Sequence, residues 1–201
     1  MDGNTKKKKV LNAINRISQD VLPTQIDYTP EMKDKIKKLL NIKDNEVDER
    51  LDNHIKYLPL NDIVKIDKEN GIKYDIWGIG WDHILTEGFH IRHHPLLESD
   101  DITKYKFPEP TDKLLSIIKK RGQKERNYFL LSLQDFTLFE RCWCIRGYEN
   151  VLTDMYYREK EINYLLDGIT EFNIEMSKRI VKMGIVDGLE QVMMSELKRV
   201  W

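Results

Sequence analysis

The spacing of hydrophobic positions changes several times along this 201-residue chain, and the changes mark the predicted elements. Helical spacing over residues 6–18 predicts a lead-in helix, and residues 21–27 suggest a short first strand. Thr29 followed by Pro30 is typical of an N-cap and a first helical position, so a helix is predicted from Pro30 to about residue 41. Asp44 could cap a second, short helix.

The central part of the chain reads as strands and turns. Residues 54–58 and 63–66 alternate enough between apolar and polar side chains to be strands. Between residues 71 and 95 the alternation continues but is interrupted by glycines, which favours hairpins. Residues 107–110, Phe-Pro-Glu-Pro, predict a loop because proline removes a backbone donor, and a helix follows from Thr111 through Arg121.

The last third of the chain carries the clearest alternation of strand and helix. The apolar run 128–133 predicts a strand, and residues 136–145 predict a helix that stops near Gly147. Apolar residues at helical spacing over 159–183 predict a long helix, after which Ile185 and Val186 could begin another strand. Residues 188–201 read as a short helical tail. This order indicates one α/β domain over residues 1–201.

Composition and charge narrow the classes of function. Hydrophobic residues make up 40% of the chain, and 33 basic residues balance 34 acidic ones to a net charge of −1. No overall field would draw nucleic acid or an anionic membrane surface. The basic block of residues 6–9 suggests the solvated start of an amphipathic helix. Without a long apolar run or the core of a secretory signal, a cytoplasmic location is expected.

Two sets of metal-ligating residue types are present. Cys142 and Cys144 are two apart on a predicted helix, where side chains point about 200° from each other, so packing thiols are predicted. The other set comprises His90, His93, His94, Asp100 and Asp101. Imidazole and carboxylate could hold a metal, but the surrounding prolines and glycines indicate an irregular surface loop, and solvated histidines are predicted instead.

Several short motifs follow one another in a set order. They are Asp75-Ile76-Trp77-Gly78, His94-Pro95-Leu96, Phe107-Pro108-Glu109-Pro110, Leu138-Phe139-Glu140, Arg146-Gly147-Tyr148-Glu149-Asn150 and Gly184-Ile185-Val186-Asp187-Gly188. In this order and spacing they resemble the N-terminal portion of the uroporphyrinogen decarboxylase-like superfamily. The resemblance implies a partial (β/α)8 barrel of the TIM type, truncated after about half of its strands, with an extra N-terminal helix and a hairpin insertion.

The resemblance also implies two kinds of chemistry: decarboxylation of a tetrapyrrole, as by a carboxy-lyase, or corrinoid-linked methyl transfer. Decarboxylases of this family place paired arginines after the first strand to grip substrate carboxylates, but residues 23–28 contain no arginine and do contain Asp27. The methyltransferase branch therefore fits better. Because the resemblance places the zinc ligands in a C-terminal half, no cofactor is expected within this chain. Zinc and corrinoid are expected only if such a half is supplied.

The resemblance assigns candidate site residues. Asp75 would be catalytic, because the family's aspartate receives pyrrole N–H groups, although Asp75 could equally be a turn residue before Gly78. Gln134, Asp135 and Phe136 would line the pocket mouth at the end of a strand, and Asp135 could instead cap the next helix. Trp77 would contact the substrate. Trp77, Trp81, Tyr105 and Trp143 could all stack on a planar macrocycle, but aromatic residues at such spacing are more often part of a hydrophobic core. No metal ligand is assigned.

A second class of function remains open. A half-barrel without catalysis of its own could be a module that self-associates or is completed by another chain, since unpaired sheet edges tend to pair. The expected partners are a tetrapyrrole or corrinoid-type small molecule and either a second copy or a separately encoded C-terminal half. Neither nucleic acid nor a membrane is expected.

Overall fold

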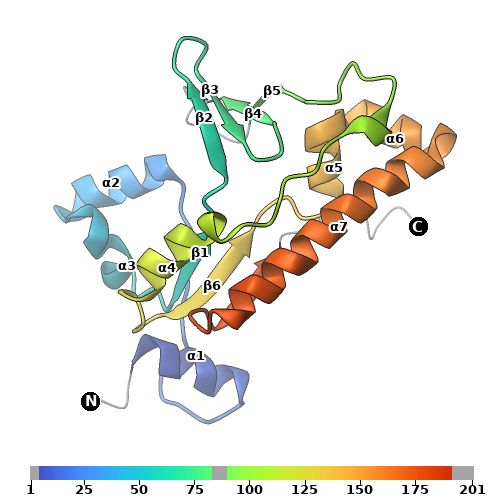
Figure 1. Cartoon of the computed structure of the whole chain (residues 1–201). Helices are drawn as coiled ribbons and strands as arrows, with labels where there is room; N and C mark the ends of the chain where they lie inside the picture. Colours follow the sequence, from blue (N-terminus) through green and yellow to red (C-terminus); the bar gives the residue numbers. More distant parts are fainter. Residues whose placement is uncertain (1–4, 83–89, 192–201) are drawn as a thin grey trace.

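Two β-sheets organise the described residues, which are 5–82 and 90–191 of the computed structural model. The first is parallel, in the order β1-β6-β7, with β1 at Ile55–Pro59, β6 at Phe129–Gln134 and β7 at Gly188–Gln191. The second is antiparallel, in the order β2-β3-β4-β5, with β2 at Ile63–Asp67, β3 at Ile72–Asp75, β4 at Gly80–Asp82 and β5 at Ile91–His93. Figure 1 shows the antiparallel sheet beyond the ends of β1 and β6.

The α/β class and the inserted hairpin strands are confirmed, while the barrel stays a prediction. The described residues form an open parallel sheet of three strands, and no closed barrel is identified among them. The strand predicted over residues 21–27 is wrong, because only an isolated parallel bridge from Thr24 to Asn53 forms there. Pro23 lacks a backbone donor and so weakens regular pairing at this point.

The helices begin and end largely where local signals place them. The α-helices are α1 (Lys6–Ile14), α2 (Pro30–Leu40), α3 (Val47–Arg50), α4 (Ser116–Gly122), α5 (Phe139–Arg146), α6 (Tyr148–Tyr157) and α7 (Glu159–Lys182). Short 3₁₀ turns are η1 (Asp44–Glu46), η2 (Ile102–Lys104) and η3 (Asp112–Leu115). Thr29 caps α2 as predicted, because its side chain accepts a hydrogen bond from the Met32 N–H. In the described residues no helix has the length and apolar character that crossing a bilayer requires.

Two local predictions are wrong, and one helix was not predicted. Residues 148–157, for which the hydrophobic pattern gave no element, form α6. The lead-in helix ends at Ile14 and not at residue 18. The tail predicted to be helical from residue 188 begins as β7, because its backbone pairs with β6 from Leu131 to Gln134. The remainder of that predicted tail, residues 192–201, lies outside the described residues.

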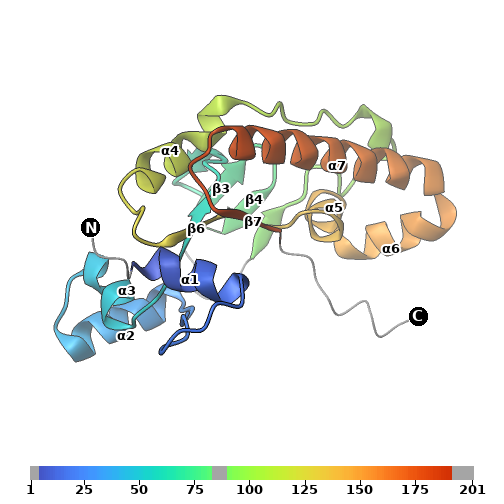
Figure 2. The same ribbon diagram turned by 90° about the horizontal axis from the view of Figure 1, so that it is seen from below.

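One face of the parallel sheet packs into the main hydrophobic core. Leu58 of β1 and Leu130 of β6 are buried there together with residues of α4 and α7, and Figure 2 shows these two helices on the same side of the strands. The buried stripe of α7 consists of Ile162, Leu165, Ile169, Phe172, Met176 and Ile180. Its spacing of three and four residues confirms the predicted amphipathic helix. Ile174 and Val181 lie off this stripe and are exposed.

A close approach fixes the loop of residues 107–110 against α7. A Cβ atom placed on Gly168 of that helix would lie 2.2 Å from the Phe107 ring. Glycine at this position therefore lets the ring pack directly on the helix backbone, although glycine is a poor helix former. Phe107 also meets the rings of Tyr105 and Tyr164. The Phe-Pro-Glu-Pro loop is thus part of the packed structure.

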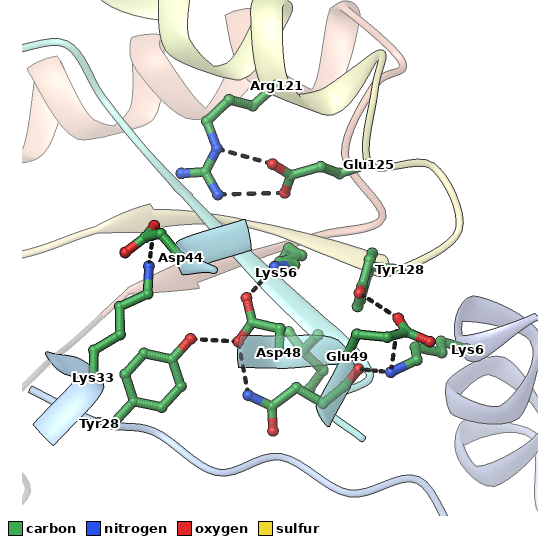
Figure 3. Close-up of polar contacts among 12 residues, drawn as sticks. Lys6, Tyr28, Lys33, Asp44, Asp48, Glu49, Lys56, Arg121, Glu125 and Tyr128 are labelled. Atoms are coloured by element: carbon green, nitrogen blue, oxygen red, sulfur yellow. Dashed lines mark hydrogen bonds and ion pairs between the residues drawn. The ribbon is translucent and has the colours of Figure 1, made fainter. Parts of the chain in front are cut away.

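A polar cluster joins the N-terminal helices to β1 (Figure 3). At its centre, Asp48 accepts hydrogen bonds from the Tyr28 hydroxyl at 2.6 Å and from Asn53 Nδ2 at 2.9 Å, and it pairs with Lys56. Lys6 is buried and donates to the carbonyl oxygen of Asn53 at 2.9 Å. The prediction that residues 6–9 are a solvated helix start is therefore wrong for Lys6, whose ammonium group lies 3.6 Å from the Glu49 carboxylate of α3 and 3.3 Å from that of Asp52.

Asp48 is expected to make folding stability depend on pH. Burial pushes its pKa upward, but the hydrogen bonds from Lys56, Tyr28 and Asn53 outweigh burial and leave the pKa lowered. A carboxyl whose pKa is lower in the folded state stabilises the fold above its unfolded pKa of about 3.9, and this contribution is lost as the pH falls through the folded value. Asp48→Asn should lower the free energy of unfolding by about 1–3 kcal/mol at pH 7.

Urea denaturation at pH 7 and at successively lower pH measures this effect. The difference between the wild type and Asp48→Asn should shrink as the pH falls. Asp44→Asn is the matched control, because the Asp44 carboxylate is largely exposed where it pairs with Lys33, and exposed pairs contribute little. A constant difference across the pH range would contradict the role given to the Asp48 charge.

Candidate functional site

A cavity of about 350 Å³ lies where β1 and β6 end and the antiparallel sheet begins. Its lining includes Asp62, Asp75, Trp81, Asp135, Phe136 and Arg141. Asp62 lies between β1 and β2, and Asp135 directly follows β6. In parallel sheets the carboxyl ends of the strands are where polar side chains from different loops meet, and this cavity has that position.

Asp75 is a buried carboxylate with several donors. Its Oδ1 accepts from the backbone N–H groups of Trp77 at 2.9 Å and Ile79 at 3.0 Å, while its Oδ2 accepts from Trp81 Nε1 at 2.9 Å and Arg141 Nη1 at 3.2 Å. These contacts close the turn between β3 and β4, in which Gly78 takes a positive φ of 76°. The Asp-x-Trp-Gly motif therefore forms a turn that Asp75 stabilises, and Asp75 also lines the cavity.

Arg141 connects three segments around the cavity. Besides its contact with Asp75, its Nε donates to the carbonyl oxygen of Phe136 at 3.1 Å and its Nη2 to that of Asp135 at 3.0 Å. Its guanidinium lies 5.0 Å from the Trp77 ring centroid and 5.7 Å from that of Phe136. Phe136 has a positive φ of 54°, a conformation that non-glycine residues seldom adopt. The guanidinium thus fixes the backbone at the cavity rim.

Two further carboxyl groups face the cavity without a cation of their own. Among the described residues, neither Asp62 nor Asp135 takes part in a salt bridge. Burial raises the pKa of Asp62, and the nearby negative charge of Asp75 adds to the effect. Although Asp135 is open to solvent, desolvation by the surrounding protein raises its pKa, which Arg141 partly offsets. Such carboxyl groups could exchange a proton closer to neutral pH than ordinary ones.

The structure places all five candidate site residues at this cavity. Trp77 is 4% exposed, and its ring packs edge to face with that of Phe172, with 4.7 Å between the ring centroids. Trp77 therefore belongs largely to the core. Gln134 is also buried and donates to Ser177 Oγ at 3.3 Å. The alternative that Asp135 caps the following helix is wrong, because α5 has Leu138 at its N-cap and no side-chain cap.

Sequence reasoning missed Asp62 and Arg141. Asp62 follows a predicted strand just as Asp135 does, so the same rule about strand ends could have identified it. Arg141 lies in α5 between buried residues, and a charged residue there needs a buried partner. Nothing in the sequence identified that partner as Asp75, which is 66 residues away along the chain.

A second hollow, of about 700 Å³, lies between residues 25–28 and the face of the parallel sheet that points away from α4 and α7. Its lining includes the half-buried side chains of Ile55 and Tyr57 and the charged residues Lys56, Arg121 and Glu190. Leu133 and Asp135 line both this hollow and the first cavity. The two spaces are therefore neighbours at the end of β6, where two ligands could lie next to each other.

The remaining metal-type residues have other contacts. Cys142 and Cys144 are free and buried in α5, as predicted, and desolvation raises the pKa of each thiol to about 12. His94, predicted to be solvated, donates from Nδ1 to the carbonyl oxygen of Cys144 at 2.8 Å, and the ring of His93 meets that of Tyr74. Within residues 5–82 and 90–191, no group of three histidine, cysteine or acidic residues could hold a metal ion.

Comparisons of the chain with protein-family models, with curated proteins and with solved structures gave no match.

Proposed function

We propose that this chain is a uroporphyrinogen decarboxylase-like protein that works in corrinoid-linked methyl transfer. The supporting observation is that two hollows share Leu133 and Asp135 in their lining, at the carboxyl end of β6. In this proposal the larger hollow binds a flat macrocycle over the sheet face that points away from α4 and α7, and the smaller cavity binds the substrate. The volumes lie in the range of ordinary ligand sites, about 300–1,000 Å³.

The charges of the larger hollow support a corrinoid over a polycarboxylated porphyrin. Its basic residues already have acidic partners: Lys33 pairs with Asp44, Lys56 with Asp48 and Arg121 with Glu125. Few positive charges are left to hold many carboxylates, whereas a macrocycle with amide side chains needs none. The half-buried Tyr57 and Leu133 offer an apolar floor for its flat face.

The residues around the smaller cavity fit proton transfer and substrate orientation. The Asp75 carboxylate and the Arg141 guanidinium fix the loop positions, as their contacts with backbone groups indicate. Asp62 and Asp135 would take up or release a proton, since desolvation by the surrounding protein raises the pKa of both, although Asp135 is open to solvent. A bound corrinoid would supply the methyl-carrying cobalt. Zinc finds no ligand set in the described part of the chain.

Binding titrations test this proposal. Hydroxocobalamin is expected to bind saturably to the full chain by calorimetry, and uroporphyrin, with its eight carboxylates, is expected to bind much more weakly. Tyr57→Ala should weaken hydroxocobalamin binding about 2- to 13-fold, because it removes an aromatic contact. Tyr156→Ala is the matched control, since that ring is 81% exposed on α6. Absence of saturable hydroxocobalamin binding, or tighter binding of uroporphyrin, would overturn the proposal.

The unpaired sheet edges also favour a second candidate, a module completed by another chain. β1 and β7 are the edge strands of the parallel sheet among the described residues, and the half-buried Ile55, Tyr57 and Leu133 line the hollow on the sheet face that points away from α4 and α7. A second copy or a separately encoded C-terminal half could cover this surface. Light scattering combined with thermal unfolding distinguishes the two: a monomer that unfolds in one sharp transition would count against this candidate.

A further inference from the structure

The smaller cavity combines aromatic rings with an excess of carboxylates. Trp81 and Phe136 are half-buried at its wall, with ring centroids 5.2 Å apart and an interplanar angle of 38°. Aromatic faces attract cations, and methylated ammonium groups in particular, because they carry little hydration to lose. The cavity therefore offers an apolar wall that prefers positive charge.

One ring of this wall, that of Phe136, already contacts a cation within the protein, together with the neighbouring core residue Trp77. The Arg141 guanidinium lies 5.0 Å from the Trp77 centroid and 5.7 Å from that of Phe136. Its charge is balanced by Asp75 at 3.2 Å. The Phe136 ring of the wall therefore contacts a cation already, and Arg141 offsets only part of the raised pKa of Asp62 and Asp135.

The remaining charges leave the cavity acidic. Asp82 pairs with Arg92 at 2.9 Å, so its charge is compensated. Asp62 and Asp135 have no salt-bridge partner among the described residues. Besides Arg141, the described lining of the cavity contains one lysine, Lys73, and no other arginine. A small cation would supply the missing charge, while an anionic substrate would be repelled.

From this arrangement we infer that the smaller cavity binds a methylated ammonium cation, with Trp81 and Phe136 against its methyl groups and Asp62 and Asp135 opposite its charge. The inference rests on the proposed function, because such a cation would occupy the substrate side of the Leu133 and Asp135 junction. It extends that function by naming the substrate class. The volume of about 350 Å³ suits a ligand of this small size.

Choline and its uncharged isostere 3,3-dimethylbutan-1-ol test the inference. The two have nearly the same shape, so a difference in affinity reports the charge. Calorimetric titration of the full chain should give saturable choline binding that is at least about tenfold tighter than that of the isostere. Equal affinities, or no choline binding up to tens of millimolar, would overturn the inference.

Two variants assign the effect to the cavity. Phe136→Leu keeps an apolar side chain without the aromatic face, and it should weaken choline binding about 3- to 30-fold. Asp135→Asn removes one charge at a solvent-open position and should narrow the gap between choline and the isostere. Asp167→Asn on α7 serves as the control, since Asp167 is not among the lining residues of the cavity. Unchanged choline affinity in Asp135→Asn, with a wild-type circular dichroism melt, would contradict the inference.

The hydroxocobalamin titration keeps the two proposals distinguishable. If hydroxocobalamin binds but choline is not preferred over the isostere, only the substrate class is wrong. If choline binds with the expected preference while hydroxocobalamin does not bind, the cation site stands and the methyl-transfer function falls.

Discussion

Arg141→Met is expected to lower the free energy of unfolding by about 3–5 kcal/mol, because it leaves the buried Asp75 carboxylate without its cation. Asp75 is 2% exposed and the Arg141 side chain 7% exposed, so water cannot replace the lost contact. The carbonyl oxygens of Asp135 and Phe136 would lose their donors at the same time. Urea denaturation at pH 7 measures the change.

The Asp75→Asn background gives the decisive control for this substitution. A neutral amide needs no countercharge, so Arg141→Met should be less destabilising there than in the wild type. Arg179→Met, at an exposed arginine of α7 that pairs with Glu175, should leave the unfolding free energy nearly unchanged. Equal losses in the wild-type and Asp75→Asn backgrounds would show that the charge of Asp75 is not what Arg141 balances.

The pH dependence of the Arg141→Met effect has a definite sign. Burial raises the pKa of Asp75, and Arg141 lowers it in part, so removing the guanidinium raises the pKa further. A carboxyl with a raised folded-state pKa favours folding most below its unfolded value of about 3.9, and this advantage is lost as the pH rises through the folded pKa. The stability difference between the wild type and the variant should therefore shrink as the pH falls from 7 toward the unfolded value of about 3.9.

Arg146→Met should have an effect of similar size, about 3–5 kcal/mol, at the opposite end of α5. Arg146 Nε donates to Asp154 at 2.8 Å, and its Nη1 donates to the carbonyl oxygens of Leu96 at 2.6 Å and Ser99 at 2.9 Å. Both side chains of the ion pair are less than a tenth exposed. The substitution would leave the buried Asp154 carboxylate without its hydrogen-bonded guanidinium and the Ser99 carbonyl oxygen without this donor, while the Leu96 carbonyl oxygen would keep only the Ser99 N–H at 3.2 Å. Chemical denaturation would record the loss.

Arg158→Met provides the comparison for Arg146→Met. Arg158 approaches the same Asp154 carboxylate, but at 3.9 Å, and its side chain is 27% exposed. Its loss should lower the unfolding free energy by about 1 kcal/mol or less. If Arg158→Met were as destabilising as Arg146→Met, burial and the loop carbonyls would not explain the importance of Arg146.

Local sequence signals predicted the elements whose boundaries depend on neighbouring residues. Thr29 and Pro30 start α2, and Gly147, with a φ of 90°, ends α5. The apolar stripe gave α7 almost to the residue. These features arise from capping, backbone freedom and helical period, all of which act over a few residues.

Features that depend on distant pairing were not predictable in the same way. The assignment of residues 188–191 as helix failed because β6 offers its backbone to them across the fold. At the site, the strand-end rule placed Gln134, Asp135 and Phe136 at the cavity. The same rule could have found Asp62, but the meeting of Asp75 with Arg141 depends on how the two sheets pack.

The adjacency of β1 and β6 also constrains the order in which the chain can fold. Ile55 pairs with Phe129 although 74 positions separate them (129 − 55 = 74), so a long loop must close before this ladder forms. Strands β2 to β5 lie inside that loop and pair only with one another, so this sheet can form early. Its formation would shorten the distance over which β1 and β6 must find each other. Folding is thus expected to be limited by the late joining of β1 to β6, since contacts between distant residues slow the search.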